Sequence, residues 1–390
     1  MAAAGGFVPP VYPFDRLEPI EKLADAHEGG CVDLSIGTPC DPPPAFAIEA
    51  LATSGAERGY PSGVGSARLR QAAAGWLGRR FGVEVAPGQI AACIGTKELV
   101  AGVPHWLHLR SPERDTVLYP ALAYPTYEMG ALLANCRAVP VPPAPDGSLE
   151  LSAIDEADAR RALVLWVNSP ANPSGDLDDL AAAAAWGRAH DVPVFSDECY
   201  AEYTWSGVPQ TILSSGPDGV VAIHSISKRS NAAGLRVGFY TGDAELVHYL
   251  SELRRHAGFM VPGPIQLAGA VCLEDDAHVA VQAGVYRRRL EYFIEVLERL
   301  GVKAPMPAGG FYLWFAAPEA IAGQRLRPEP GEGAEWAFTR FFAEVAGCLV
   351  SPGEFYGPPG VGFVRIAMVQ PDERLELVAR RVDAYLAAGA

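Results

Sequence analysis

Four short apolar runs, each of which turns polar at its carboxyl end, constrain the fold of this chain more than any other feature. In chain order they are DTVLYP, ALVLWVNSPANPSG, VPVFSDECY and GVVAIHSISK, and the helix-like segment DDLAAAAAWGRAHD lies between the second and the third. Such alternation is typical of strands that crossover helices join into a parallel sheet. Because ligands of these sheets bind beyond the carboxyl ends of the strands, we expect one crevice to collect four polar residues, Asn172, Asp197, Tyr200 and Lys228.

The sequence also predicts two domains. Its 390 residues exceed what one hydrophobic core usually organises, and beyond residue 243 the chain becomes helix-rich, followed by the strand-like GGFYLWFA and VGFVRIAMV. We predict a large α/β domain over residues 44–274, with a mostly parallel central sheet and helices on both faces. Residues 1–43 and 275–390 are expected to form an N-terminal arm and a smaller α+β domain. The arm is expected to pack with that smaller domain or with a neighbouring subunit.

Charge and apolar content narrow the classes of partner. A formal net charge of −15 argues against nucleic acid and anionic membranes. No apolar stretch approaches the ~20 residues of a membrane span, and the first residues lack the pattern of a secretory signal, so we expect a cytoplasmic protein that acts on small molecules. The sequence contains no HExxH, Walker or GxGxxG motif, which removes the usual support for a metallopeptidase, a nucleotide hydrolase or a dinucleotide enzyme.

The seven cysteines are scattered and include no CxxC pair. An odd number without paired spacing predicts neither a disulfide framework nor a structural zinc site, and we expect no metal. We interpret Cys93 and Cys199 as small buried fillers and His224 as a packed strand residue. No Cys–His–Asn or Ser–His–Asp arrangement links these three residues to other polar groups.

Lys228 is one of only four lysines in the chain, with Lys22, Lys97 and Lys303. A free lysine amine, with a pKa of roughly 10.4, is a poor nucleophile at neutral pH, but desolvation or a nearby positive charge can activate it for Schiff-base formation. Pyridoxal phosphate uses such a lysine. That cofactor also needs a carboxylate opposite its ring nitrogen, donors around its phenolic oxygen and a cradle for its phosphate, and the chain offers a candidate for each part.

Three motifs, SPANPSG, SDECY and SISKRSNAAGLRVG, resemble in this order the motif set of fold-type I pyridoxal-phosphate aminotransferases, and the resemblance covers nearly the whole chain. It implies the fold-type I architecture and pyridoxal 5'-phosphate as cofactor. Lys228 would hold the cofactor covalently and shuttle a proton, Asp197 would pair with the ring nitrogen, and Asn172 and Tyr200 would donate hydrogen bonds to the phenolic oxygen. The phosphate would be held by the side chains of Ser225, Ser227 and Arg236 and by the backbone N–H groups of Thr96 and Lys97, at the start of a helix.

The same resemblance implies residues around the cofactor ring and the substrate. Tyr124 in YPALAYPTYEMG would stack on the ring, with Tyr127 the second choice. Tyr60 in RGYPSGVGSARLR would reach the phosphate of a neighbouring subunit, which implies a homodimer. The α-carboxylate of the substrate would be gripped by Arg365 in FVRIAM, because a planar guanidinium makes two parallel bonds. Substrate-binding residues are therefore expected to be Arg365, Gly37 and Asn172.

The segments GTKELV, LAYPTYEMGA and SKRSNAAGLRVGF are most similar to N-succinyl-LL-diaminopimelate aminotransferases of lysine and peptidoglycan-precursor biosynthesis. This similarity implies the conversion of N-succinyl-LL-2,6-diaminopimelate and 2-oxoglutarate to N-succinyl-2-amino-6-ketopimelate and glutamate. Arg229 either recognises the distal carboxylates or points away from the site. Lys97 is either a second basic group near the cofactor or a solvated lysine at the start of a helix.

Four alternatives remain open on the sequence. The chain could be another class I/II aminotransferase, acting on aspartate, alanine or aromatic amino acids, or a pyridoxal-phosphate-dependent C–S β-lyase, because one scaffold supports several bond cleavages. A pyridoxal-phosphate-binding regulator would need a DNA-binding module, and the N-terminal arm is short and shows no helix-turn-helix pattern. A structural relative without cofactor would be colourless.

Overall fold

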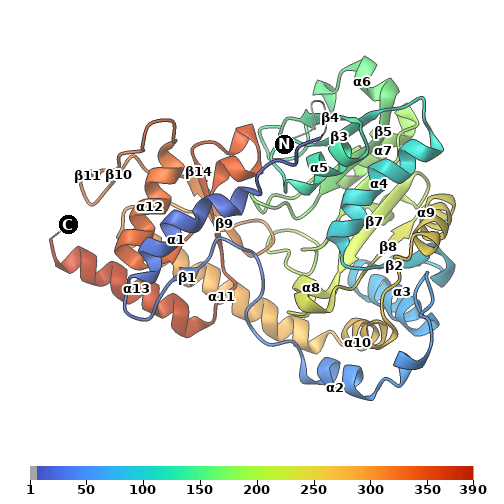
Figure 1. The fold of residues 1–390 in the computed structure, drawn as a ribbon, viewed down its shortest axis with the longest axis horizontal. Helices are drawn as coiled ribbons and strands as arrows, with labels where there is room; N and C mark the ends of the chain where they lie inside the picture. Colours follow the sequence, from blue (N-terminus) through green and yellow to red (C-terminus); the bar gives the residue numbers. More distant parts are fainter. Residues whose placement is uncertain (1–6, 390) are drawn as a thin grey trace.

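The computed structural model describes residues 7–389. Its larger part is built on a seven-stranded sheet, and Figure 1 shows this sheet with its helices on the right and a smaller part on the left. In spatial order the strands are β2 (Ile90–Cys93), β8 (Gly238–Gly242), β7 (Val220–Ser225), β6 (Val194–Asp197), β5 (Ala162–Asn168), β3 (Thr116–Pro120) and β4 (Arg137–Val141). Strand β8 runs antiparallel to both of its neighbours, and the other pairs are parallel. The four predicted runs are β3, β5, β6 and β7, so the predicted, mostly parallel sheet is confirmed.

Both faces of the sheet are covered, which explains why its central strands are mostly apolar. All seven residues of β5 are buried. Alternate side chains of a strand point to opposite faces. Leu165 and Val167 accordingly join a core with one set of helices, whereas Val164 and Trp166 join a core with another set. Parallel strands that are buried on both faces read as continuous hydrophobic runs.

The helices divide between these two faces. One core includes α2 (Ala45–Thr53), α3 (Ala67–Phe81), α7 (Leu180–His190) and α10 (Gly263–Glu274). The other includes α4 (Thr96–Arg110), α5 (Thr126–Leu133) and α9 (Ala244–His256). Two short helices complete this part, α6 (Glu156–Arg161) and α8 (Ile226–Arg229), and α8 begins where β7 ends.

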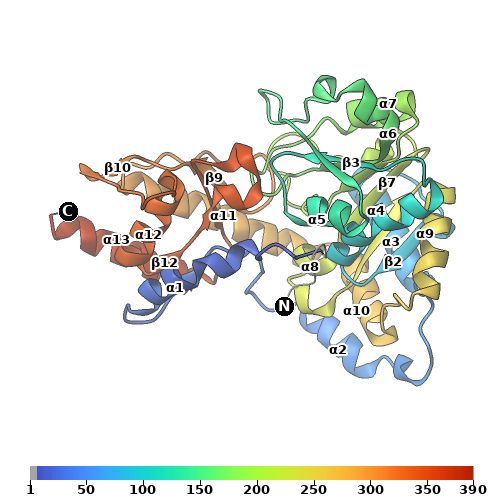
Figure 2. The same cartoon turned by 45° about the horizontal axis from the view of Figure 1, so that its top comes forward.

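The smaller part has its own core around an antiparallel sheet of three strands, β13 (Ser351–Pro352), β14 (Phe363–Ala367) and β9 (Tyr312–Ala316). Its helices are α11 (Ala277–Arg299), α12 (Ala334–Ala346) and α13 (Asp372–Ala387). Two short pairs of strands flank it, β1 (Val32–Asp33) with β12 (Cys348–Leu349) and β10 (Ala320–Ile321) with β11 (Gln324–Arg325). In Figures 1 and 2 the long helix α11 runs from the smaller part to the larger one.

The N-terminal segment belongs to the smaller part by its contacts. Helix α1 (Glu18–Asp25) packs on α12 through Leu17, Ile20 and Ala24, and β1 pairs in parallel with β12. Of the two alternatives for the predicted arm, packing with the later part of the chain is observed from Leu17 to Asp33, whereas residues 1–6 lie outside the described residues. Ahead of α1, the chain runs back toward the larger part (Figures 1 and 2).

The described residues contain neither a helix suited to a membrane nor a cluster of metal ligands. Within residues 7–389, no helix is long and apolar enough to span a membrane. In that same stretch of the chain, His, Cys, Asp and Glu side chains form no group that could hold a metal ion.

Candidate active site

A cavity of about 250 Å³ lies at the carboxyl ends of the central strands and is closed on its other side by β14 and the N-terminal segment. Strand β5 ends at Asn168 and β6 at Asp197, and these two residues are aligned in the sheet. The crevice expected from the sequence is therefore present. All predicted site residues except Tyr60 line it: Gly37, Thr96, Lys97, Tyr124, Asn172, Asp197, Tyr200, Ser225, Ser227, Lys228, Arg236 and Arg365.

Asp197 is held at the floor of the cavity by hydrogen bonds from two other groups. The hydroxyl of Tyr127 donates to Oδ2 at 3.0 Å, and the backbone N–H of Cys199 donates to Oδ1 at 3.2 Å. Burial raises the pKa of Asp197, while these hydrogen bonds and the charge of Lys228 act to lower it. Asp197 lines the cavity, and each of its two carboxylate oxygens accepts one of these hydrogen bonds.

Tyr127 is a residue whose contact the sequence did not reveal. The sequence offers it only as the second choice for stacking on a ring, yet its hydroxyl contacts Asp197 and its ring packs 5.4 Å from that of Trp166. No local pattern indicates this contact, because Tyr127 lies on α5 and its partner lies at the end of β6.

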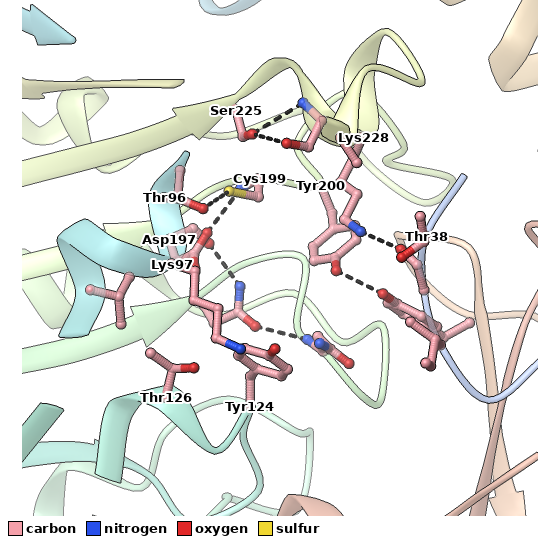
Figure 3. A pocket seen from close by; sticks show the side chains of 18 of the residues that line it. Thr38, Thr96, Lys97, Tyr124, Thr126, Asp197, Cys199, Tyr200, Ser225 and Lys228 are labelled. Atoms are coloured by element: carbon pink, nitrogen blue, oxygen red, sulfur yellow. Dashed lines mark hydrogen bonds between the residues drawn. The ribbon is translucent and has the colours of Figure 1, made fainter. Parts of the chain in front are cut away.

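Lys228 projects from α8 toward the N-terminal segment, as Figure 3 shows. Its Nζ donates a hydrogen bond to the backbone oxygen of Gly37. Burial lowers the pKa of the Lys228 amine from 10.5 to about 8, and the positive charges of Arg365 and Arg236 act in the same direction. A lysine amine that is about half neutral at pH 8 is competent to attack an aldehyde.

Arg229, the next residue, points away from the cavity and is 2% exposed. Its Nε donates to Glu202 Oε1 at 2.7 Å, and one terminal nitrogen donates to Asp276 Oδ1 at 2.7 Å. The sequence left open whether Arg229 recognises distal carboxylates or points away from the site. The structure shows that it points away, and this geometry excludes the recognition of distal carboxylates.

Hydrogen-bond donors gather at the start of α4. Gly95 precedes the helix with φ 68° and ψ 159°, a conformation that is essentially restricted to glycine, and no side chain caps the helix. A methyl group on Gly95 would collide with the guanidinium of Arg236, so these two groups are in close contact. Ser225 and Ser227 lie beside them with their hydroxyl oxygens 2.9 Å apart.

This donor set fits a phosphate group. The first N–H groups of a helix have no partner within the helix, and together with the helix dipole they favour an anion. Two hydroxyl groups and an arginine add charge-assisted hydrogen bonds. The residues present are therefore chemically suited to the phosphate of pyridoxal 5'-phosphate, while the Lys228 amine and the Asp197 carboxylate suit its aldehyde and its ring nitrogen.

Arg365 lies in β14 on the opposite side of the cavity and is 2% exposed. One terminal nitrogen donates to Asn172 Oδ1 at 2.8 Å, another donates to the backbone oxygen of Ser35, and Nε has no partner among the described residues. The guanidinium lies 4.3 Å from the ring centroid of Tyr312 and 4.8 Å from that of Tyr356. A buried guanidinium with an unused N–H group is suited to bind a carboxylate.

Two residues expected at the phenolic oxygen have protein partners in this structure. The amide oxygen of Asn172 accepts from Arg365, so its amide nitrogen is the group left to donate. The hydroxyl of Tyr200 lies 2.7 Å from the hydroxyl of Tyr312. The expected core strand GGFYLWF is confirmed as the segment containing β9, but Tyr312 also lines the cavity, which the pattern of a core strand did not predict.

The mouth of the cavity is aromatic and carries one lysine. Lys97 Nζ lies 5.2 Å from the ring centroid of Tyr12 and 5.3 Å from that of Tyr124, and the two tyrosine hydroxyls are 3.4 Å apart. Figure 3 shows Lys97 and Tyr124 side by side. Tyr12 and Phe14 come from the N-terminal segment, which the sequence did not assign to the site.

Three further expectations can be compared with the structure. Tyr60 is 97% exposed and lies outside the cavity of its own chain. His224 is buried with its ring 4.9 Å from that of Trp76, which confirms it as a packed strand residue. Cys93 is buried as expected, but Cys199 is more than a filler, because it lines the cavity and its thiol donates to Thr96 Oγ1 at 3.4 Å.

Comparisons with known proteins agree with this chemistry. Residues 30–382 match the family described as aminotransferase class I and II. The chain is 40% identical over 381 residues to the 4-dedimethylamino-4-oxo-anhydrotetracycline transaminase OxyQ of Streptomyces rimosus, covering 96% of this chain and 99% of that protein. It is 38% identical over 382 residues to the probable aminotransferase Rv1178 of Mycobacterium tuberculosis, covering 96% of this chain and 85% of that protein.

Solved structures give the same result. A probable N-succinyldiaminopimelate aminotransferase from Thermus thermophilus is 31% identical, with a TM-score of 0.79 over 95% of this chain and 99% of that one. The N-succinyldiaminopimelate aminotransferase from Mycobacterium tuberculosis is 25% identical, with a TM-score of 0.84 over 97% of this chain and 100% of that one. With its fold-type I sheet, its buried lysine and its family match, this chain belongs to the class I and II aminotransferases, which use pyridoxal 5'-phosphate as cofactor.

Proposed function

We propose that this aminotransferase converts N-succinyl-LL-2,6-diaminopimelate and 2-oxoglutarate to N-succinyl-2-amino-6-ketopimelate and glutamate, in the formation of lysine and peptidoglycan precursors. The observation that carries this proposal is the position of Lys97 at the aromatic mouth of the cavity. Among the described residues the Lys97 amine has no ion pair and lies against two tyrosine rings. By contrast, Arg236, Lys228 and Arg365 each donate a hydrogen bond to a backbone or amide oxygen. A substrate with a distal carboxylate would find its charge partner there.

The names of two structural neighbours support the same substrate. Both neighbours described above are named as N-succinyldiaminopimelate aminotransferases, one of them as a probable one. The proposal also agrees with the aromatic lining, since Tyr12 and Tyr124 offer apolar surface to the long carbon chain of such a substrate.

Each residue has a defined part in the proposed reaction. When bound, pyridoxal phosphate supplies an aldehyde for the lysine and a protonated ring that accepts the electron pair left when the substrate loses its Cα proton. The Lys228 amine would hold the cofactor and, once the amino substrate has taken its place, would carry the proton from Cα. Its lowered pKa, about 8, suits a group that must both accept and return a proton near neutral pH.

The other residues bind and orient. Asp197 keeps the ring nitrogen protonated, Asn172 and Tyr200 donate hydrogen bonds to the phenolic oxygen, and Tyr124 stacks on the ring. Arg365 grips the α-carboxylate beside the backbone of Gly37. The phosphate would be bound by residues at the start of α4, at the junction of β7 with α8 and just ahead of β8: Thr96, Lys97, Ser225, Ser227 and Arg236.

Subunit and domain organisation belong to the proposal. The side chain of Tyr60 is almost entirely exposed to solvent. By the family resemblance, this tyrosine would complete the phosphate site of a second copy of the chain in a homodimer. Residues 44–274 would form the cofactor-binding unit, and residues 1–43 and 275–390 the unit that carries Arg365.

A half-reaction screen tests the substrate. Holoenzyme is mixed with single amino acids, and the absorbance of the cofactor is followed as it changes from its aldehyde to its amine form. Glutamate and N-succinyl-LL-diaminopimelate should both drive this change. Conversion by aspartate, alanine or an aromatic amino acid but not by N-succinyl-LL-diaminopimelate would replace the proposal with one of those activities, and release of pyruvate and ammonia from cystathionine would indicate a β-lyase.

A matched variant tests the role of Lys97. Lys97→Met keeps the length of the side chain and removes its charge. The KM for N-succinyl-LL-diaminopimelate should rise roughly 10-fold, as expected for loss of one charge-assisted hydrogen bond, while turnover of a donor without a distal carboxylate, such as alanine, should not fall in parallel. An equal effect on both donors would contradict the assigned role.

A polycyclic ketone is the second candidate substrate. The relative from Streptomyces rimosus is named as a transaminase of 4-dedimethylamino-4-oxo-anhydrotetracycline, and the mouth formed by Tyr12, Phe14 and Tyr124 offers aromatic surface for a flat ring system. With glutamate as donor, the same assay can include this ketone as acceptor. Faster turnover of the ketone than of the succinylated keto acid, N-succinyl-2-amino-6-ketopimelate, would favour this candidate.

A further inference from the structure

The loop that leads into α4 is hydrogen-bonded to a glutamate, and the carboxylate of this glutamate forms an ion pair with a buried arginine. Glu98, in the first turn of α4, accepts a hydrogen bond from the backbone N–H of Ile94 on Oε1 at 2.8 Å. Arg254 of α9 binds the same carboxylate with two nitrogens, at 2.7 Å to Oε2 and 2.6 Å to Oε1. The side chain of Arg254 is 1% exposed and that of Glu98 is 23% exposed, so the arginine is buried and the carboxylate is partly shielded from solvent.

The guanidinium of Arg254 is surrounded by three aromatic rings. Its guanidinium carbon lies 5.3 Å from the ring centroid of Trp106, 5.3 Å from that of Phe259 and 5.9 Å from that of Tyr240. Removing both charges from water is costly, and a buried ion pair is often no more stabilising than apolar residues of the same volume. The presence of this pair in an apolar core therefore calls for a reason other than stability.

The reason lies in the charge balance at the start of α4. Thr96 and Lys97 are the first two residues of α4 and line the site that suits a phosphate, and Glu98 is the next residue along the helix. Without Arg254, the Glu98 carboxylate would still fix the loop through Ile94, but its charge would repel a phosphate dianion bound within the same turn. When Arg254 neutralises this charge, Glu98 fixes the loop without the repulsion.

We propose that Glu98 and Arg254 are positioning residues for the cofactor phosphate: the glutamate orders the loop Ile94–Gly95, and the arginine cancels its charge next to the anion. The inference rests on the part of the proposed function that places the phosphate at the start of α4. It does not depend on the identity of the amino substrate.

The test compares two ligands that differ only in the phosphate. Full-length apoprotein is titrated with pyridoxal 5'-phosphate and with pyridoxal, and the Kd of each is read from absorbance. Arg254→Met should raise the Kd for pyridoxal phosphate roughly 10- to 100-fold and leave that for pyridoxal within about threefold, because only the phosphate senses the unpaired carboxylate. The double variant Glu98→Gln/Arg254→Met should recover a Kd for pyridoxal phosphate within about threefold of the original, since glutamine retains an oxygen for Ile94.

A matched control exists on the same two helices. Arg110 of α4 pairs with Glu245 of α9 at the opposite end of this helix pair. Arg110→Met should leave both dissociation constants unchanged, which separates an effect of charge at the phosphate from a general loosening of α4 against α9.

Two results would overturn the inference. One is equal weakening of pyridoxal phosphate and pyridoxal by Arg254→Met, which would make the pair purely structural. The other is a double variant that binds pyridoxal phosphate more than tenfold more weakly than the original chain. The double variant buries no unpaired charge, so this second criterion applies even if Arg254→Met is not recovered folded. Failure of the unaltered chain to bind pyridoxal phosphate would overturn both this inference and the proposed function, whereas a failed substrate screen would leave the inference intact.

Discussion

The amine of Lys228 should titrate near pH 8, where an ordinary lysine remains almost fully protonated. The cause is burial, with the charges of Arg365 and Arg236 acting in the same direction. With a pKa of about 8 instead of 10.5, half of the amines are neutral at pH 8, against roughly 0.3% for an ordinary lysine. The nucleophilic form is thereby enriched on the order of 150-fold, which is the advantage that the site would confer on attack at an aldehyde.

Two variants separate the electrostatic causes of this shift. Arg365→Met removes a positive charge and should raise the pKa of Lys228. Asp197→Asn removes a negative charge that favours the ammonium form and should lower the pKa further. The opposite signs matter, because a general loosening of the site would bring in water and raise the pKa in both variants.

The rarity of lysine makes the measurement direct. Reductive methylation of the apoprotein with ¹³C-formaldehyde labels only four lysines and the N-terminus, and Lys228→Arg identifies the resonance of interest. Lys22 is a useful internal reference, since its hydrogen bond with Glu18 raises its pKa. A Lys228 resonance that titrates at or above pH 10, or a decrease of its pKa in Arg365→Met, would refute the reasoning.

Four shorter predictions follow from individual contacts. Arg365→Lys should raise the KM for glutamate roughly 10- to 100-fold with a smaller change in kcat, measured by initial rates, because a lysine cannot make two parallel bonds to a carboxylate. Tyr127→Phe should lower kcat about 5- to 10-fold without a matching rise in KM, through loss of its 3.0 Å bond to Asp197. Gly95→Ala should weaken cofactor binding in an absorbance titration, because its backbone conformation and the guanidinium packed against it exclude a side chain. If Tyr60 acts across a dimer, mixing inactive Lys228→Ala subunits with Tyr60→Ala subunits should produce hybrid dimers with one intact site, and the absence of any gain in activity would argue against that role.

The parts of the fold that could be predicted are those with a local signature. Strand β5 is apolar from Ala162 to Val167 because both faces of the sheet are covered, and the polar residues Asn168 and Asn172 that follow line the cavity. The same reasoning applies to β6 and β7, which is why Asp197 and Lys228 could be expected in one crevice from their positions in sequence. A sheet aligns the ends of its parallel strands, so polar residues that follow each apolar run come together in one site.

The parts that could not be predicted depend on contacts between elements. Tyr12, Tyr127 and Tyr312 lie on three separate segments, and each reaches the cavity only because of how those segments pack. The sequence around Tyr312 reads correctly as a core strand, and that description is incomplete because one end of the strand opens into the cavity. The interpretation of Cys199 as a filler fails for the same reason, since a small apolar residue in a buried motif carries no sign of which side it faces.

Lys228 and Arg229 illustrate how little adjacency in sequence says about function. Successive residues of a helix do not share a face, and the two side chains leave α8 in different directions. Lys228 enters the cavity, whereas Arg229 binds Glu202 and Asp276 and donates to backbone oxygens at the end of α10. These contacts fix α8 against the helices behind the sheet, so the arginine that the sequence offered as a candidate for substrate recognition instead holds the short helix from which the lysine projects. A rigid support of this kind keeps a buried amine at one position while its covalent partner changes, which is a requirement of any reaction in which the same lysine is displaced and then returns.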